Sequence, residues 1–374
     1  MLAGTLPNGQ PYGIIGRDGV LMSAFHLQVQ FAADPSKVPE FDPKKVEARL
    51  TELKKSGIDP TDVAQTVKRL ESVYARDPDD LCSPAAKAQF LAEKKEFEKD
   101  KTAFAEKFVA KLDIVKDIFA EDTKIPREQL IFVPQPDFHV DMHMRPVAPG
   151  QIMINDFTQN IALIDAALKK ATPGSWEEKE LKTMRKHAEE MQKIMGPVME
   201  EIEKRCQQGG LETIKAPGVV EGQFESVTLR PDTIVTYVPA ADPADPWRPV
   251  RARLLVDGIS GETAYSRKEL GAAIRKKIGA GNDHFIDGIL DEWFTRHVNF
   301  MNAIPGTKPG TNEQFYMTNA TSNGPLRDVY EEYLKKKGVE EVVWMGDDGG
   351  GEGQRTGAEE SLLAQGGLDC RENH

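Results

Sequence analysis

The stretch QFYMTNATSNGPLRDVYEEYLKKKGVEEVVWM, residues 314–345, carries the clearest structural pattern in this chain. Its aromatic start, Gln314–Thr318, predicts a strand. The apolar spacing that follows predicts a helix over Gly324–Lys337, and the apolar run Val339–Met345 predicts a second strand. A strand, a helix and a strand in direct succession are typical of an α/β protein.

The same alternation continues toward the N-terminus. Apolar spacing predicts a strand at Ile125–Val133 and a helix at Thr158–Lys170. A helical run from Ser175 to about Arg205 is expected to break at Gly196-Pro197. Short strands are expected through 211–258, and further helices at 267–278 and 286–300. The chain therefore reads as α/β, without a strict sequence repeat.

Two segments depart from this alternation. Residues 1–36 are expected to be β-rich, with apolar runs at Tyr12–Ile15 and Phe25–Phe31 on either side of a polar turn. Residues 42–120 have helical spacing, and four phenylalanines recur there at intervals of seven and four amid Lys and Glu. We expect a long solvated helix or one arm of a helical hairpin, inserted into the α/β chain.

Composition excludes several classes of protein. Lys and Arg number 48 against 60 Asp and Glu, a net charge of −12, which disfavours nucleic-acid binding. No apolar run approaches the roughly 18–20 residues of a membrane span, and the N-terminus lacks a secretory signal pattern. Three cysteines without a CxxC pair predict neither a disulfide framework nor zinc, so we expect a reducing, cytoplasmic location.

The segment Phe138–His143 is the first candidate for chemistry. On an extended strand His139, Asp141 and His143 would share one face, while Val140 and Met142 would pack inward. A histidine beside a carboxylate can deliver a proton next to a bound cation. An edge strand with exposed polar residues and a divalent-metal site formed by the three side chains are alternative interpretations.

The other two candidates lie near the chain ends. Cys370 follows Gly366-Gly367, and glycines let the backbone approach a ligand closely, whereas Cys82 and Cys206 are expected to be small buried hydrophobes. A thiol in an electropositive pocket can ionise and attack carbon. Asp18, in Arg17-Asp18-Gly19, is by itself above all a turn-former.

Taken in order, Arg17-Asp18-Gly19, His139-Val140-Asp141 and the Gly-Gly-containing approach to Cys370 resemble the guanidino-group-modifying (pentein) superfamily. That family includes arginine, agmatine and protein-arginine deiminases. The resemblance implies a single catalytic domain over 1–374, a five-module α/β propeller, with helical insertions at 42–120 and 175–207.

The resemblance also implies a mechanism without metal or organic cofactor. Asp18 and Asp141 would bind the guanidinium, Cys370 would attack its carbon, and His139 would serve as acid and then as base. Ammonia and a ureido product such as citrulline would leave. Arg145 could pair with a substrate carboxylate or with a structural partner.

Several alternatives stay open. An amidinotransferase would replace the water with an amine, a metal-dependent hydrolase would use His139, Asp141 and His143, and a non-catalytic binding protein would use none of them. Free arginine, agmatine and peptidyl arginine are equally compatible with the sequence as substrates, as is association of identical copies. No nucleic-acid or membrane partner is expected.

Overall fold

The structure is a computed structural model that describes residues 1–75, 84–135, 140–228, 235–240, 251–255, 264–278, 283–349, 351 and 356. The chain divides into two compact units. The first, which we call the sheet unit, comprises Met1–Gly16, Ile131–Ile234 and Val256–His374. The second, the helical unit, comprises Arg17–Leu130 and Val235–Leu255.

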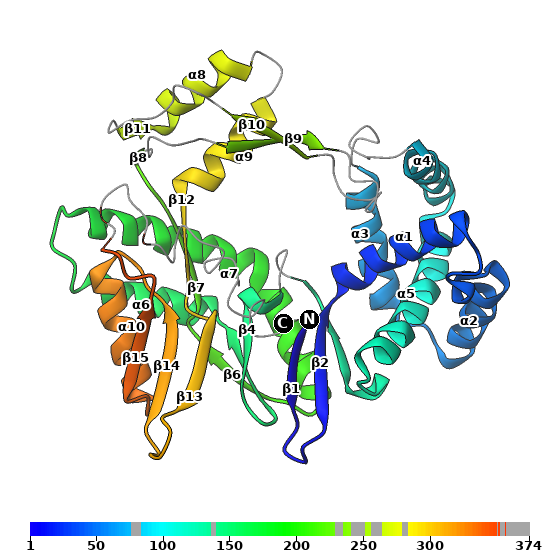
Figure 1. The fold of residues 1–374 in the computed structure, drawn as a ribbon, viewed down its shortest axis with the longest axis horizontal. Coiled ribbons are helices and arrows are strands. Elements are labelled where there is room, and N and C mark those ends of the chain that lie inside the picture. Colours follow the sequence, from blue (N-terminus) through cyan, green and yellow to red (C-terminus); the bar gives the residue numbers. More distant parts are fainter. Residues whose placement is uncertain are drawn as a thin grey trace. The chain divides into compact units, whose positions relative to one another are not determined.

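A small module recurs among the described strands (Figure 1). Two adjacent strands form an antiparallel hairpin, and a third strand joins the second one after a helical crossover. In the second and third modules that last pairing is parallel, which requires a crossover of this kind. The modules consist of β1 (Leu2–Thr5), β2 (Pro11–Gly16) and β3 (Leu130–Val133); β4 (Met144–Ala148), β5 (Gln151–Asn155) and β6 (Glu212–Ala216); and β13 (Ala303–Thr307), β14 (Gln314–Asn319) and β15 (Glu341–Met345).

The remaining described strands pair two by two, all antiparallel. β7 (Val219–Gln223) pairs with β12 (Thr295–Asn299), and β8 (Ser226–Thr228) pairs with β11 (Ala264–Ser266). β9 (Val235–Ala240) and β10 (Arg251–Leu255) form a hairpin within the helical unit. The fold is thus mixed α/β, built from small sheets, and the five-module propeller stays a prediction.

The described residues of the sheet unit also form the α-helices α6 (Phe157–Leu168), α7 (Trp176–Gln208), α8 (Arg267–Ile278), α9 (Asp283–Phe294) and α10 (Gly324–Lys336). The predicted break at Gly196-Pro197 is wrong, because α7 continues through Pro197. Its two halves are each fixed by a core. Met184 on the N-terminal side packs in one hydrophobic cluster, and Ile202 on the C-terminal side packs in another. This burial on both sides outweighs the backbone hydrogen bond that proline removes.

The helical unit contains α1 (Arg17–Ala33), α2 (Pro43–Ser56), α3 (Pro60–Tyr74), α4 (Pro84–Lys99) and α5 (Lys101–Thr123). The expected strand at Phe25–Phe31 is wrong, since these residues belong to α1. Val20, Leu21, Ala24 and Phe25 are all buried, and their spacing places them on one helical face. That helical period extends across the segment expected to be strand and turn.

The recurring phenylalanines form a core. Phe90, Phe97 and Phe108 are buried, and the rings of Phe90 and Phe97 each lie 5.3 Å from that of Tyr74, centroid to centroid. The stretch is also divided into two helices at Asp100, whose carboxylate accepts a hydrogen bond from the Ala103 amide at 3.0 Å. A single long solvated helix is therefore excluded for this stretch, because its aromatic face packs against α3.

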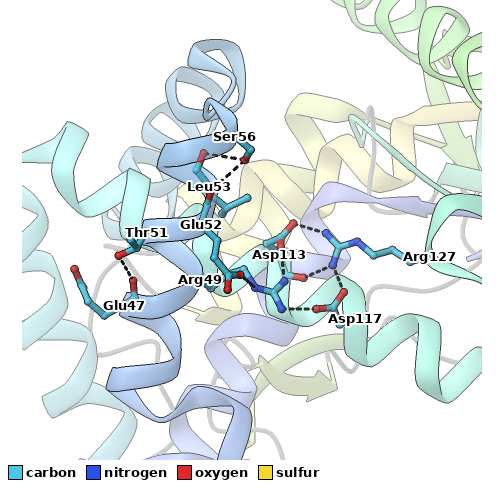
Figure 2. A network of polar contacts seen from close by, with 9 residues as sticks. All are labelled: Glu47, Arg49, Thr51, Glu52, Leu53, Ser56, Asp113, Asp117 and Arg127. Atoms are coloured by element: carbon cyan, nitrogen blue, oxygen red, sulfur yellow. Dashed lines mark hydrogen bonds and ion pairs between the residues drawn. The ribbon is translucent and has the colours of Figure 1, made fainter.

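Two arginines and two aspartates link α2, α5 and the segment after α5 in the helical unit (Figure 2). Arg49 of α2 donates to Asp113 at 2.6 Å and to Asp117 at 2.8 Å, both on α5. Arg127 donates to the same two carboxylates. Since the two aspartates are one helical turn apart, they present a paired acceptor that fits planar guanidinium groups.

Candidate functional site

Asp141 lies in a single 3₁₀ turn, Val140–Met142, directly before β4. The predicted extended strand, with polar and apolar side chains on opposite faces, is therefore wrong here. A 3₁₀ helix has three residues per turn and does not alternate. Val140, Asp141, Met142 and His143 are all buried, with Asp141 8% exposed. His139 lies outside the described residues.

His143 is fixed to the end of the neighbouring strand. Its amide donates to the Val140 carbonyl at 3.1 Å, and its own carbonyl accepts from the Asn155 amide at 2.8 Å. Its ring nitrogen Nδ1 lies 3.4 Å from Asn155 Nδ2, and its ring centroid 6.2 Å from that of Phe157. Across the described residues, no three His, Cys, Asp or Glu side chains form a group able to hold a metal ion.

Arg145, two residues further on in β4, is also buried. It lies near Tyr316 of β14, whose pKa is raised by burial while the Arg145 charge acts in the opposite direction. The Tyr316 hydroxyl itself donates to the Phe300 carbonyl at 3.1 Å. Arg145 therefore belongs to the interior of the sheet unit, and its role stays a prediction.

Asp18 stands at the start of α1, where a carboxylate is stabilised by the helix dipole. The predicted polar turn at Arg17-Asp18-Gly19 is thus the first turn of a helix. Asp18 accepts a hydrogen bond from Arg69 of α3, and the adjacent Arg17 pairs with Asp62 of the same helix at 2.5 Å. Asp18 belongs to the helical unit and Asp141 to the sheet unit.

The predicted nucleophile, Cys370, lies outside the described residues, as does Cys82. Cys206 is buried at the end of α7, and burial raises the pKa of its thiol to about 12. A thiol with so high a pKa stays protonated and unreactive at neutral pH. The prediction that Cys206 is a small buried hydrophobe is confirmed.

Two asparagines that the sequence did not single out tie the second module to β7. The Asn155 side-chain oxygen accepts from the Val219 amide at 3.0 Å and from Asn160 Nδ2 at 3.1 Å. Asn160 in turn accepts from the Gly218 amide at 2.8 Å and donates to the Val219 carbonyl at 2.6 Å. All of these groups are buried, so each amide satisfies backbone that water cannot reach.

The third module repeats the arrangement. Asn319 ends β14 as Asn155 ends β5, and its Nδ2 donates to the Asn299 carbonyl at 3.0 Å. Asn299 accepts from the Met301 and Asn302 amides at 3.0 and 3.1 Å. The sequence does carry a weak signal of this repetition, a Met-x-Asn triplet at the end of both strands: 153–155 and 317–319.

A buried ion pair fixes the segment after β15. Arg296 is fully buried and pairs with Glu180 at 2.7 Å, with its guanidinium 4.1 Å from the ring centroid of Phe224. It also donates to Ser322 and to the Gly351 carbonyl. Thr356, further along, donates to the Ala320 carbonyl at 3.2 Å. The chain that leads to Cys370 is thus anchored at Gly351 and Thr356.

One more titratable cluster joins α7, β7 and β12. Glu221 lies 2.6 Å from His187 Nε2 and 3.0 Å from His297 Nδ1. Burial opposes ionisation of Glu221, but its hydrogen bonds to the two histidines outweigh burial and hold its pKa well below the usual range. The hydrogen bond to Glu221 raises the pKa of His187.

Comparison with protein-family models, with curated proteins and with solved structures yields no match for this chain. No helix in the described ranges has the length and apolar character needed to cross a membrane.

Proposed function

We propose that this protein hydrolyses a guanidino group and adopts a five-module α/β propeller with helical insertions. The recurring module of three strands and a crossover carries this proposal, because Asp18 and Asp141 lie beside strands of two of these modules. Asp18 follows the second strand of the first module, and Asp141 precedes the first strand of the second. Cys370 follows the last strand of the third module in sequence.

A guanidinium is a poor electrophile, because attack on its central carbon removes its resonance. Asp18 and Asp141 would hold its plane by charge-assisted hydrogen bonds. The burial of Asp141 supports this role, since a low dielectric strengthens its attraction to a cation. The contacts of Asp113 and Asp117 with Arg49 illustrate, in this same chain, how two aspartates hold one guanidinium (Figure 2).

The Cys370 thiolate would add to the central carbon, and His139 would protonate the departing nitrogen so that ammonia leaves. The resulting S-alkylthiouronium would be attacked by a water molecule from which His139 removes the proton. Collapse of that adduct would expel the thiolate and leave a ureido group. We place the reaction in the cytoplasm, where thiols stay reduced.

The test is incubation with arginine, agmatine and an arginine-rich protein, with ammonia and ureido product both assayed. Cys370→Ala, His139→Ala and Asp141→Asn should each lower turnover by several orders of magnitude with the fold intact. Cys206→Ser, a thiol that stays protonated, serves as the matched control and should retain turnover.

Two further arms separate the alternatives. If the chain is an amidinotransferase, adding an amine acceptor should yield the product of transfer to that amine and no free ureido compound. A chelator should leave hydrolysis unchanged. If the chelator abolishes activity while Cys370→Ala retains it, the thiol mechanism is refuted and a metal-dependent hydrolase takes its place.

A further inference from the structure

Two crossed ion pairs connect the first turn of α1 with one face of α3. Arg17 pairs with Asp62 at 2.5 Å, and Arg69 donates to Asp18. Asp62 and Arg69 are seven residues apart, two helical turns, so both lie on the same face of α3. The two adjacent residues of α1 therefore meet partners of opposite charge on one helix.

The contact between Arg69 and Asp18 is of the same chemical kind as the contact proposed for the substrate. In both, a guanidinium donates to the Asp18 carboxylate. The pair is open to solvent, because the Asp18 side chain is 27% exposed and the Arg69 side chain 45%. Ion pairs this exposed are weak, so a second guanidinium can displace Arg69 at small cost.

We infer that Arg69 is an internal competitor of the guanidino substrate: its own side chain occupies the Asp18 carboxylate until the substrate replaces it. The inference rests on the proposed function, since it assumes that Asp18 binds the substrate. It makes Arg69 a residue that sets affinity, without a part in the chemical step. Removing its guanidinium should therefore tighten binding and leave the rate of the bound complex unchanged.

A purely structural role for Arg69 predicts something different. If the pair served only to hold α1 against α3, losing it would resemble losing the companion pair of Arg17 and Asp62. That companion pair is comparably exposed, with side-chain fractions of 24% and 32%. Asp62→Asn is accordingly the matched control, because it breaks an ion pair between the same two helices without touching Asp18.

The experiment measures binding of arginine and agmatine by calorimetry in the full-length Cys370→Ala protein, where turnover cannot interfere. Adding Arg69→Gln should lower Kd by about two- to fivefold, the range expected for loss of one exposed competing pair. Adding Asp62→Asn should leave Kd within about 1.5-fold, below that range, because it removes no competitor from Asp18. Adding Asp18→Asn should remove measurable binding whether or not Arg69 is present.

The possible failures are distinct. If Asp18→Asn abolishes binding but Arg69→Gln leaves Kd unchanged or raises it, the competition is refuted and the proposed substrate contact stands. If Arg69→Gln and Asp62→Asn tighten binding equally, the effect comes from loosening the helices and the inference is wrong. If Asp18→Asn leaves Kd unchanged, or no variant binds either probe, both the inference and the role of Asp18 are refuted.

Discussion

The two units satisfy their polar side chains in different ways. The sheet unit buries neutral amides, such as Asn155, Asn160 and Asn319, against backbone groups. In the helical unit, the helices are tied by partly exposed ion pairs such as those in Figure 2. Neutral hydrogen bonds are insensitive to salt, whereas partly exposed ion pairs are screened by it. The comparison predicts that added salt weakens the helical unit selectively.

The largest effect should come from a charged pair buried in the sheet unit, Arg296 and Glu180. Arg296→Met leaves Glu180 without its cation at a site that is 5% exposed. A buried charge without its partner should lower the free energy of unfolding by about 4 kcal/mol, at low and high salt alike. Urea denaturation measures this loss. Arg267→Met, which breaks an exposed pair with Asp291, should cost below about 0.5 kcal/mol.

Asn160→Ala tests the neutral network. It leaves the Gly218 amide and the Val219 carbonyl without their partner at a fully buried position, which should cost about 3 kcal/mol. Asn8→Ala, which removes an exposed turn contact, is its control and should be almost neutral. If the loss for Asn160→Ala shrinks markedly when NaCl is raised from about 0.05 to about 1 M, which shortens the screening length to about 3 Å, the sheet unit is not held by neutral hydrogen bonds as described.

Asp113→Asn tests the helical unit, where one carboxylate serves both Arg49 and Arg127. Because these side chains are only partly buried, the loss should be about 1–2 kcal/mol at low ionic strength. At 1 M salt the screening length falls to about 3 Å. The free energies of unfolding of the wild type and the variant should then be nearly equal. Urea titrations at the two salt concentrations check this. Equal losses at both would show that the network behaves as neutral hydrogen bonds do.

The smallest effect concerns pH. The raised pKa of His187 means that its protonation stabilises the fold below its unfolded value of 6.5 and ceases to do so as pH rises through the raised value. The lowered pKa of Glu221 stabilises above 4.5, so the pair contributes most between these two values. Between pH 6 and 9 the wild type should lose about 0.5 kcal/mol more stability than His187→Gln, a modest figure because the histidine is 38% exposed. If the free energies of unfolding of the wild type and His187→Gln change equally with pH, the pH dependence does not come from His187.

Much of the third module could be predicted from its sequence. The strand at Gln314 and the helix at Gly324 begin where expected, and α8 has the predicted bounds. These elements have one dominant period each. In 17–33 the apolar residues suit either a short strand or one helical face, and only packing against α5 decides for the helix. Local pattern alone therefore fails where tertiary contacts choose between two periods.

The candidate site was harder to predict for the same reason. The prediction that His139, Asp141 and His143 share one face requires an extended strand. The chain instead enters β4 through a 3₁₀ turn, in which apolar and polar side chains are both buried. The sequence does not single out Asn155 and Asn319, because one Asn at a strand end is indistinguishable from an ordinary turn residue. Their role emerges only from the backbone groups of distant segments that they satisfy.

The continuity of α7 has a consequence for how the sheet unit unfolds. At 33 residues the helix is about 50 Å long, and its two halves belong to separate hydrophobic clusters. If either cluster loses its packing, one half of α7 is exposed. Because α7 is a single continuous helix, loss of packing in one cluster destabilises the other cluster. Pro197, which donates no backbone hydrogen bond, marks the point where this coupling is weakest. Native-state hydrogen exchange should show amides on both sides of Pro197 opening together, as one cooperative unit.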